Sequence, residues 1–156
     1  MALEEYVKAD VTGVYEVIVE NILNYAVALK CEDEEGLGNL ILPIFIGEIE
    51  AMSIKMALEG ISYKRPLTHD LIVSILETLG VEVERVTIDA LIGNVYTATL
   101  VLKDHYGLAN NNLHYVDSRP SDAIAIALRV KAPIYVAKRL LKHAIPEDKF
   151  KRSSNK

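Results

Sequence analysis

The sequence has few of the features that mark secreted or membrane proteins. It holds a single cysteine in 156 residues, so no disulfide can form within the chain, which suits a reducing cytoplasm. No apolar run approaches the roughly 20 residues that a membrane-spanning helix needs. The acidic residues 1–5 lack the basic and apolar regions of a signal peptide. We therefore expect a cytoplasmic protein that does not enter a membrane.

The motifs of several enzyme classes are also absent. The sequence has neither a G-x-G-x-x-G nor a G-x-x-x-x-G-K-S segment, so neither standard nucleotide-phosphate loop is present. It has no G-x-S-x-G nucleophile elbow, and it has no H-E-x-x-H segment or Cys/His grouping for zinc. No linker, repeat or low-complexity stretch interrupts the chain. We therefore expect one domain without an organic cofactor.

The composition is that of a globular protein whose charge is unevenly distributed. Apolar residues make up 51% of the chain, which is enough for a sizeable core. Residues 1–137 carry a net charge of −10, whereas residues 138–156 carry +5. An acidic body is a poor platform for nonspecific nucleic-acid binding, which depends on phosphate neutralisation. We expect a domain at 1–137, followed at 138–156 by a short helix and a basic tail that is either solvated or in contact with nucleic acid.

Hydrophobic periodicity predicts an α+β fold. The expected strands are 11–19, 23–31, 40–46, 81–91, 95–103, 114–117 and 133–136, and the expected helices are 48–59, 68–79, 120–131 and 138–144. Gly93 and Asn94 signal a hairpin, and a slip in alternation near residues 84–86 predicts a bulge. Cys31 falls in an alternating strand pattern that predicts a buried thiol. This order of elements predicts a compact single domain with a mixed, largely antiparallel sheet and three to four helices.

Glu50 has an unusual position on the helix expected at 48–59. Successive helical residues turn by about 100°, so Glu50 points away from the solvated side of Glu48 and towards the side of Ile54. A carboxylate there is expected to be partly buried, and a buried charge needs a partner or a metal. Glu50 therefore either forms a salt bridge with an arginine, such as Arg65 or Arg119, or belongs to a functional site.

Residues 65–71 (RPLTHDL) open the second expected helix. Thr68 is a plausible N-cap, and an aspartate in the first turn, Asp70, is favoured by the helix dipole. His69 differs, because it lies on the apolar side of the helix with Ile72 and Val73. It is therefore either a hydrogen-bonded core histidine or a ligand or base that faces a cleft.

Residues 117–122 (DSRPSD) open the third expected helix, with Pro120 suited to its first turn. Helix capping accounts for most of this segment, but it does not explain why Asp117 and Asp122 bracket Arg119. Grouped carboxylates can hold Mg²⁺ or Mn²⁺, and an arginine can clamp a phosphate by two parallel hydrogen bonds. These are the parts that a metal-dependent phosphodiesterase needs.

These segments resemble the bifunctional nuclease domain family, long catalogued as a domain of unknown function. The matching segments are residues 42–47 (LPIFIG), 50–51 (EA), 65–71 (RPLTHDL), 117–125 (DSRPSDAIA), 129 (R) and 132–136 (APIYV). The resemblance covers roughly residues 10–137, with minor departures at 62–64 and Ser118. It implies nuclease activity on RNA and DNA and assembly into oligomers. The positions that it carries over are Glu50, Arg65, His69, Asp70, Asp117, Arg119 and Asp122.

The leading hypothesis is a metal-assisted nuclease. In it, His69, Asp70 and Asp122 are the catalytic candidates, with His69 as the proton-transfer group. Arg65 and Arg119 would hold the scissile phosphate. Glu50, Asp117 and Asp122, with Asp70 as a further candidate, would bind Mg²⁺ or Mn²⁺.

A non-catalytic alternative remains open from the sequence. The same Arg, Asp and Glu side chains would then form an ion-pair network that ties three helices together. The chain would be a homo-oligomer, a dimer or larger, that binds a small anion or a protein or acts as a regulator. The acidic body and the apolar helices favour this alternative.

Overall fold

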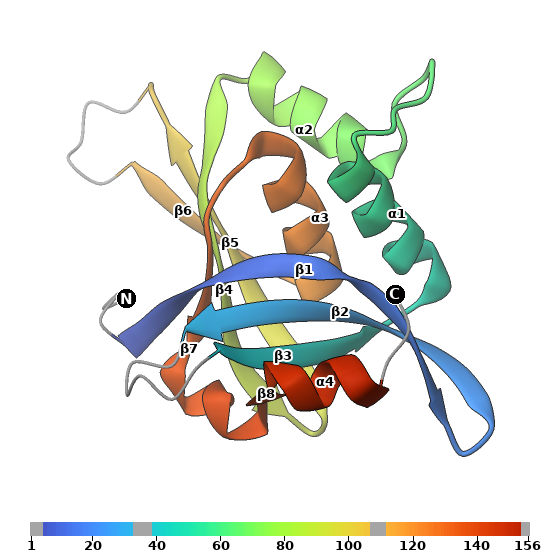
Figure 1. Cartoon of the computed structure of the whole chain (residues 1–156). Helices are drawn as coiled ribbons and strands as arrows, with labels where there is room; N and C mark the ends of the chain where they lie inside the picture. The colour runs from blue at the N-terminus through green and yellow to red at the C-terminus, as the bar shows by residue number, and fades with distance from the viewer. Residues whose placement is uncertain (1–4, 33–38, 107–111, 154–156) are drawn as a thin grey trace.

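The computed structural model describes residues 5–32, 39–106 and 112–153, and an eight-stranded sheet runs through them (Figure 1). The strands are β1 (Tyr6–Val19), β2 (Ile22–Glu32), β3 (Asn39–Ile46), β4 (Val81–Ile92), β5 (Val95–Asp104), β6 (Leu113–Ser118), β7 (Ile134–Ala137) and β8 (Ile145–Pro146). The helices of these residues are α1 (Glu48–Glu59), α2 (Thr68–Thr78), α3 (Pro120–Val130), α4 (Glu147–Ser153) and the 3-10 helix η2 (Lys138–His143).

The sheet is mixed and largely antiparallel. Its strand order is β6-β5-β4-β7-β1-β2-β3-β8, and β4 and β7 form the parallel pair. The other neighbours pair antiparallel. The predicted α+β fold is therefore confirmed, as is a compact single domain.

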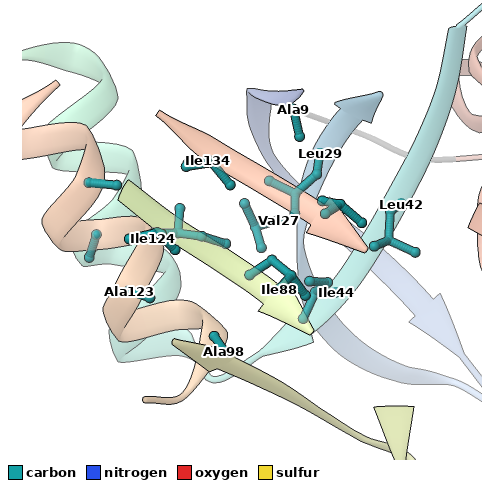
Figure 2. Close-up of a cluster of buried hydrophobic side chains, with 14 of the residues drawn as sticks. Ala9, Val27, Leu29, Leu42, Ile44, Ile88, Ala98, Ala123, Ile124 and Ile134 are labelled. Carbon is teal, nitrogen blue, oxygen red and sulfur yellow. The ribbon is translucent and has the colours of Figure 1, made fainter. Parts of the chain in front are cut away.

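The main core lies between the sheet and helices α1, α2 and α3, which gather on one side of the sheet (Figure 1). Figure 2 shows Ile124 of α3 pointing into the cluster that holds Val27, Ile44 and Ile88. Ile124 is fully buried, and burial of such a side chain contributes roughly 1.5–3 kcal/mol. The neighbouring small residue Ala123 is also fully buried, which lets α3 approach the sheet closely. This packing fixes the start of α3, where the candidate site lies.

Turns and bulges follow the sequence signals closely. Gly93 and Asn94 both have positive φ angles, 56° and 64°, as a tight hairpin between β4 and β5 requires. The pairing of β4 with β5 shifts register between Val83 and Arg85, where the bulge was predicted. The predicted buried thiol is also confirmed, because Cys31 is fully buried and burial raises its pKa to about 12. Local chemistry therefore determines these features.

Two predictions are wrong. Thr68 is not the N-cap of α2, because the helix starts at Thr68 and the capping position belongs to Leu67, whose N–H donates to Oδ2 of Asp70 at 3.1 Å. The C-terminal segment is not a solvated tail over its described part. Phe150 of α4 is buried and meets the ring of Tyr15 edge-on at a centroid distance of 4.9 Å. Phe150 therefore covers the face of β2 and β3 that lies opposite to the main core.

Some expectations fall partly or wholly outside the described residues. The connections between the strands expected at 23–31 and 40–46, and between those expected at 95–103 and 114–117, include residues 33–38 and 107–111, which the structure does not describe. In the described part of the chain, no helix is long and apolar enough to cross a membrane.

Candidate functional site

A network of charged and polar side chains joins α1, α2 and α3, and it extends along α3 from the first turn of this helix to the last. Its members are Glu50 and Ser53 of α1, His69 and Asp70 of α2, and Asp122 and Arg129 of α3, together with Arg119, which precedes α3. Helix α3 packs against both α1 and α2, so residues far apart in the sequence meet here (Figure 1).

Arg119 joins two carboxylates at the exposed end of this network. Its Nε donates to Oδ2 of Asp122 at 2.8 Å, and its Nη2 donates to Oδ1 of Asp122 at 3.1 Å. Its Nη1 donates to Oε1 of Glu50 at 3.2 Å. The side chain of Arg119 is nevertheless 64% exposed, and two of its five N–H groups remain for other acceptors. The hydrogen bond to Asp122 raises the pKa of Arg119 further.

His69 lies behind Asp122, with both ring nitrogens in hydrogen bonds. Nε2 is 2.8 Å from Oδ1 of Asp122, and Nδ1 is 2.6 Å from Oγ of Ser53. The residue is only 8% exposed. Partial burial opposes ionisation of Asp122, but hydrogen bonds from Arg119 and His69 outweigh it and lower the pKa of Asp122. Asp122 is therefore held as a carboxylate between two donors.

Arg129 and Asp70 form the buried end of the network. Nε of Arg129 donates to Oδ1 of Asp70 at 2.8 Å, and Nη2 donates to Oγ of Ser53 at 3.2 Å. Nη1 donates to the carbonyl of Ala125 at 2.9 Å. The hydrogen bond from Arg129 lowers the pKa of Asp70 below its ordinary value. The Arg129 side chain is 10% exposed, so this end of the network has the environment of a structural ion pair.

The helices bring together five of the seven residues singled out in the sequence. Glu50, Arg119, Asp122 and His69 form one chain of contacts, and Asp70 joins them through Arg129 and Ser53. The other two residues, Arg65 and Asp117, do not join it within the described residues. Arg65 is exposed and its Nε donates to the carbonyl of Lys64, while Asp117 lies exposed on β6.

The network as it stands does not fit a resident divalent cation. Glu50 and Asp122 converge, but the guanidinium of Arg119 bridges them, and a guanidinium has no free electron pair with which to coordinate a cation. Over residues 5–32, 39–106 and 112–153, no three His, Cys, Asp or Glu side chains form a group that could hold a metal ion. The positive charge at this point is supplied by the protein itself.

A groove of about 310 Å³ adjoins Arg119. It lies where the end of β3, the start of α1, the β4–β5 hairpin and the start of α3 meet, and both Glu50 and Arg119 line it. Gly47, just before α1, helps to form it, because a Cβ at this position would overlap Oε2 of Glu50. The exposed end of the network therefore opens onto a concave surface.

Ser53 and Arg129 belong to the network, although neither was predicted from the sequence to have a role at the site. Ser53 follows Glu50 by three residues and therefore lies on nearly the same side of α1. Arg129 follows Asp122 by seven residues, or about two helical turns. The same helical spacing that revealed the orientation of Glu50 would have placed both residues beside the site.

Comparison with known proteins identifies the family. The sequence matches the family model of the bifunctional nuclease domain over residues 29–148. An uncharacterised protein of Mycobacterium tuberculosis is 39% identical over 117 residues, which are 73% of this chain and 66% of that protein. Bifunctional nucleases 1 and 2 of Arabidopsis thaliana are 35% and 34% identical, over 74% and 77% of this chain but only 34% and 36% of their own lengths. The chain belongs to the bifunctional nuclease domain family.

Proposed function

We propose that this protein is a nuclease that hydrolyses phosphodiester bonds of RNA, DNA or both at the groove beside Arg119. The observation that carries the proposal is that the guanidinium of Arg119 is both fixed in position and exposed to a ligand. Its guanidinium is fixed by two carboxylates, yet it is largely exposed at a groove and keeps two N–H groups for a ligand. A fixed guanidinium is suited to bind two phosphate oxygens at once. The family and the names of its plant relatives support the same reaction.

Within this proposal, each residue of the exposed end has a role. Arg119 would bind the scissile phosphate and stabilise the charge that grows on its oxygens. Glu50 lines the groove, so we assign it the role of the general base that takes the proton of the attacking water. Asp122 and His69 would hold Arg119 in position, since neither nitrogen of the buried His69 is free to meet a substrate directly. The leaving oxygen would take its proton from solvent.

The predicted Mg²⁺ or Mn²⁺ remains a prediction that this mechanism does not use. A cation bound by both Glu50 and Asp122 would have to displace Arg119 from them. Cleavage with each metal and with EDTA tests this point directly. If EDTA abolishes cleavage and Mn²⁺ restores it, the cation has a catalytic part that the present arrangement of Arg119 does not provide.

The assay that tests the proposed function is cleavage of single-stranded RNA and DNA by purified wild-type protein and by Asp122→Asn. Asp148→Asn is a matched control, because Asp148 pairs with Arg152 four residues later on the surface of α4, far from Arg119 in sequence. We expect cleavage to fall in Asp122→Asn and to persist in Asp148→Asn. Equal cleavage by all three proteins would indicate a contaminating nuclease and would overturn the proposal.

A second candidate is a non-catalytic homo-oligomer held together through helix α2. Leu71, Ile75 and Leu79 are all exposed and lie four residues apart, so they form an apolar stripe on the outer side of α2. The pairing of Glu50, Asp70 and Asp122 with arginines also suits a structural network. Light scattering on wild type and on Ile75→Glu tests this candidate. The non-catalytic candidate predicts that the wild type is an oligomer, that Ile75→Glu dissociates it, and that neither protein cleaves RNA or DNA.

A further inference from the structure

We infer that the groove beside Arg119 binds an unstacked base of a single-stranded nucleic acid, with Phe45 as the surface on which the base stacks. This inference rests on the proposed function, because it names the form of the substrate that the same site would take. Phe45 is an exposed aromatic side chain for which the packing of the fold gives no reason.

Phe45 is exposed where burial would be expected. It follows Ile44 on β3, and Ile44 faces the main core with 3% exposure while Phe45 points to the other side with 58% exposure. Its neighbour in the pairing of β2 with β3 is the small residue Ala26. The side chain of Phe45 therefore lies largely open, and Phe45 is one of the residues that line the groove beside Arg119.

The opposite wall of the groove comes from the β4–β5 hairpin. Asn94, at the turn, and Tyr96, on β5, line the groove together with Phe45. The positive φ of Asn94, 64°, is part of the tight turn that holds this wall in place. An amide group can donate to and accept from the edge of a base, and a tyrosine ring can contact its face. The two walls thus combine aromatic surface with hydrogen-bonding groups.

The size of the groove distinguishes a single strand from a duplex. Its volume of about 310 Å³ is at the lower end of the roughly 300–1,000 Å³ found for small-molecule sites. It can take a group of the size of one nucleotide, but not the stacked pairs of a double helix. In a duplex, each base face is already covered by its neighbours, so only an unstacked base can offer its face to Phe45.

The charge of the groove favours a base that carries its phosphate. Arg119 provides a cation beside the aromatic wall, and single-strand sites typically combine such a cation with an aromatic stacking surface. Glu50 lines the same groove, but its carboxylate already pairs with Nη1 of Arg119 at 3.2 Å. The phosphate would therefore bind at the Arg119 end and the base at the Phe45 end.

The test measures binding and cleavage separately for wild type, Phe45→Ala, Phe45→Tyr and the control Ile92→Ala. Ile92, at the end of β4 in the β4–β5 hairpin, is a similarly exposed apolar residue, but it is not among the residues that line the groove. The probes are a fluorescent single-stranded oligonucleotide and a fluorescent duplex of the same sequence. Fluorescence anisotropy measures the affinity of each protein for each probe. Loss of one stacked base weakens binding by about 5- to 150-fold. We expect that loss for the single strand with Phe45→Ala only, with near wild-type binding for Phe45→Tyr and Ile92→Ala.

The outcomes separate this inference from the proposed function. Binding of the single strand that depends on Phe45, without cleavage by wild type, supports the base site and overturns the nuclease. Cleavage by wild type with unchanged binding in Phe45→Ala supports the nuclease and overturns the base site. Equal affinity of wild type for the duplex and the single strand, or no binding at all, overturns the base site. A change in oligomeric state in Phe45→Ala with unchanged oligonucleotide binding assigns the groove to a protein contact and also overturns it.

Discussion

The two arginines of the network should differ in how much stability the protein loses when each is replaced by methionine, which keeps most of the side-chain volume and removes the charge. Arg129 is 10% exposed and donates to Asp70, Ser53 and the carbonyl of Ala125. Arg119 is 64% exposed and donates to Glu50 and Asp122. We expect Arg129→Met to lower the free energy of unfolding strongly and Arg119→Met to lower it little.

The magnitudes follow from the environment of each charge. Removal of one partner of a fully buried ion pair costs about 3–5 kcal/mol. Asp70, which Arg129→Met would leave without its arginine, has a side chain that is 34% exposed. Water would therefore solvate part of it, and we expect a loss of about 2–3 kcal/mol. Exposed pairs such as those of Arg119 contribute about 0–1 kcal/mol. For a chain of this size, each kcal/mol lowers the melting temperature by about 2–4 °C.

The assay is urea unfolding followed by circular dichroism, with the same variants melted thermally. Arg152→Met is a matched control for an exposed arginine, because Arg152 pairs with Asp148 on the surface of α4. We expect the free energy of unfolding to rank wild type, Arg152→Met and Arg119→Met close together, with Arg129→Met well below. An equal loss for Arg119→Met and Arg129→Met would refute the division of the network into a buried structural end and an exposed end that is free to bind a ligand.

Three further predictions concern single groups. Because Arg129 lowers the pKa of Asp70, this carboxylate stabilises the fold above the ordinary aspartate pKa of about 3.9 and loses that effect as the pH falls through its lower folded value. The difference in free energy of unfolding between wild type and Asp70→Asn should therefore be largest near neutral pH and shrink below about pH 4, and a constant difference would contradict this. Gly47 has φ −74° and ψ 164°, which alanine can adopt, but a Cβ there would overlap Oε2 of Glu50. Gly47→Ala should therefore impair cleavage while it costs about 1 kcal/mol or less in urea unfolding; unchanged cleavage would argue against a role for Glu50. Cys31 is fully buried with its pKa raised to about 12, so a thiol reagent should modify it only after denaturation, and rapid labelling of the folded protein would contradict its burial.

Features determined by local chemistry could be predicted from the sequence. The helix at Glu48–Glu59 was predicted with its observed bounds, because Gly47 ends a buried strand and Gly60 ends the helix in a left-handed conformation. The inward position of Glu50 followed from the helical turn per residue alone. The N-cap of α2 was misassigned, because the preference of threonine for that position did not outweigh the contact of Asp70 with the backbone of Leu67.

Features that depend on distant contacts could not be predicted in the same way. Residues 65–71 and 117–122 both carry an arginine and aspartates, but the sequence does not reveal which of them face each other. The structure joins Asp122 to His69, 53 positions away, and leaves Arg65 and Asp117 outside the network in the described residues. Ser53 and Arg129 complete the contacts because α1 and α3 pack together, which the sequence alone does not specify.

The claim that Arg119 is the group that meets the phosphate is tested most directly by the cleavage rate of Arg119→Met. The measurement is single-turnover cleavage of a single-stranded oligonucleotide by wild type, Arg119→Met and Arg152→Met, each first shown to be folded. We expect Arg119→Met to cleave about 100-fold more slowly or worse, as is typical when one group that stabilises transition-state charge is removed, and Arg152→Met to match wild type. A folded Arg119→Met that cleaves as fast as wild type would contradict the account.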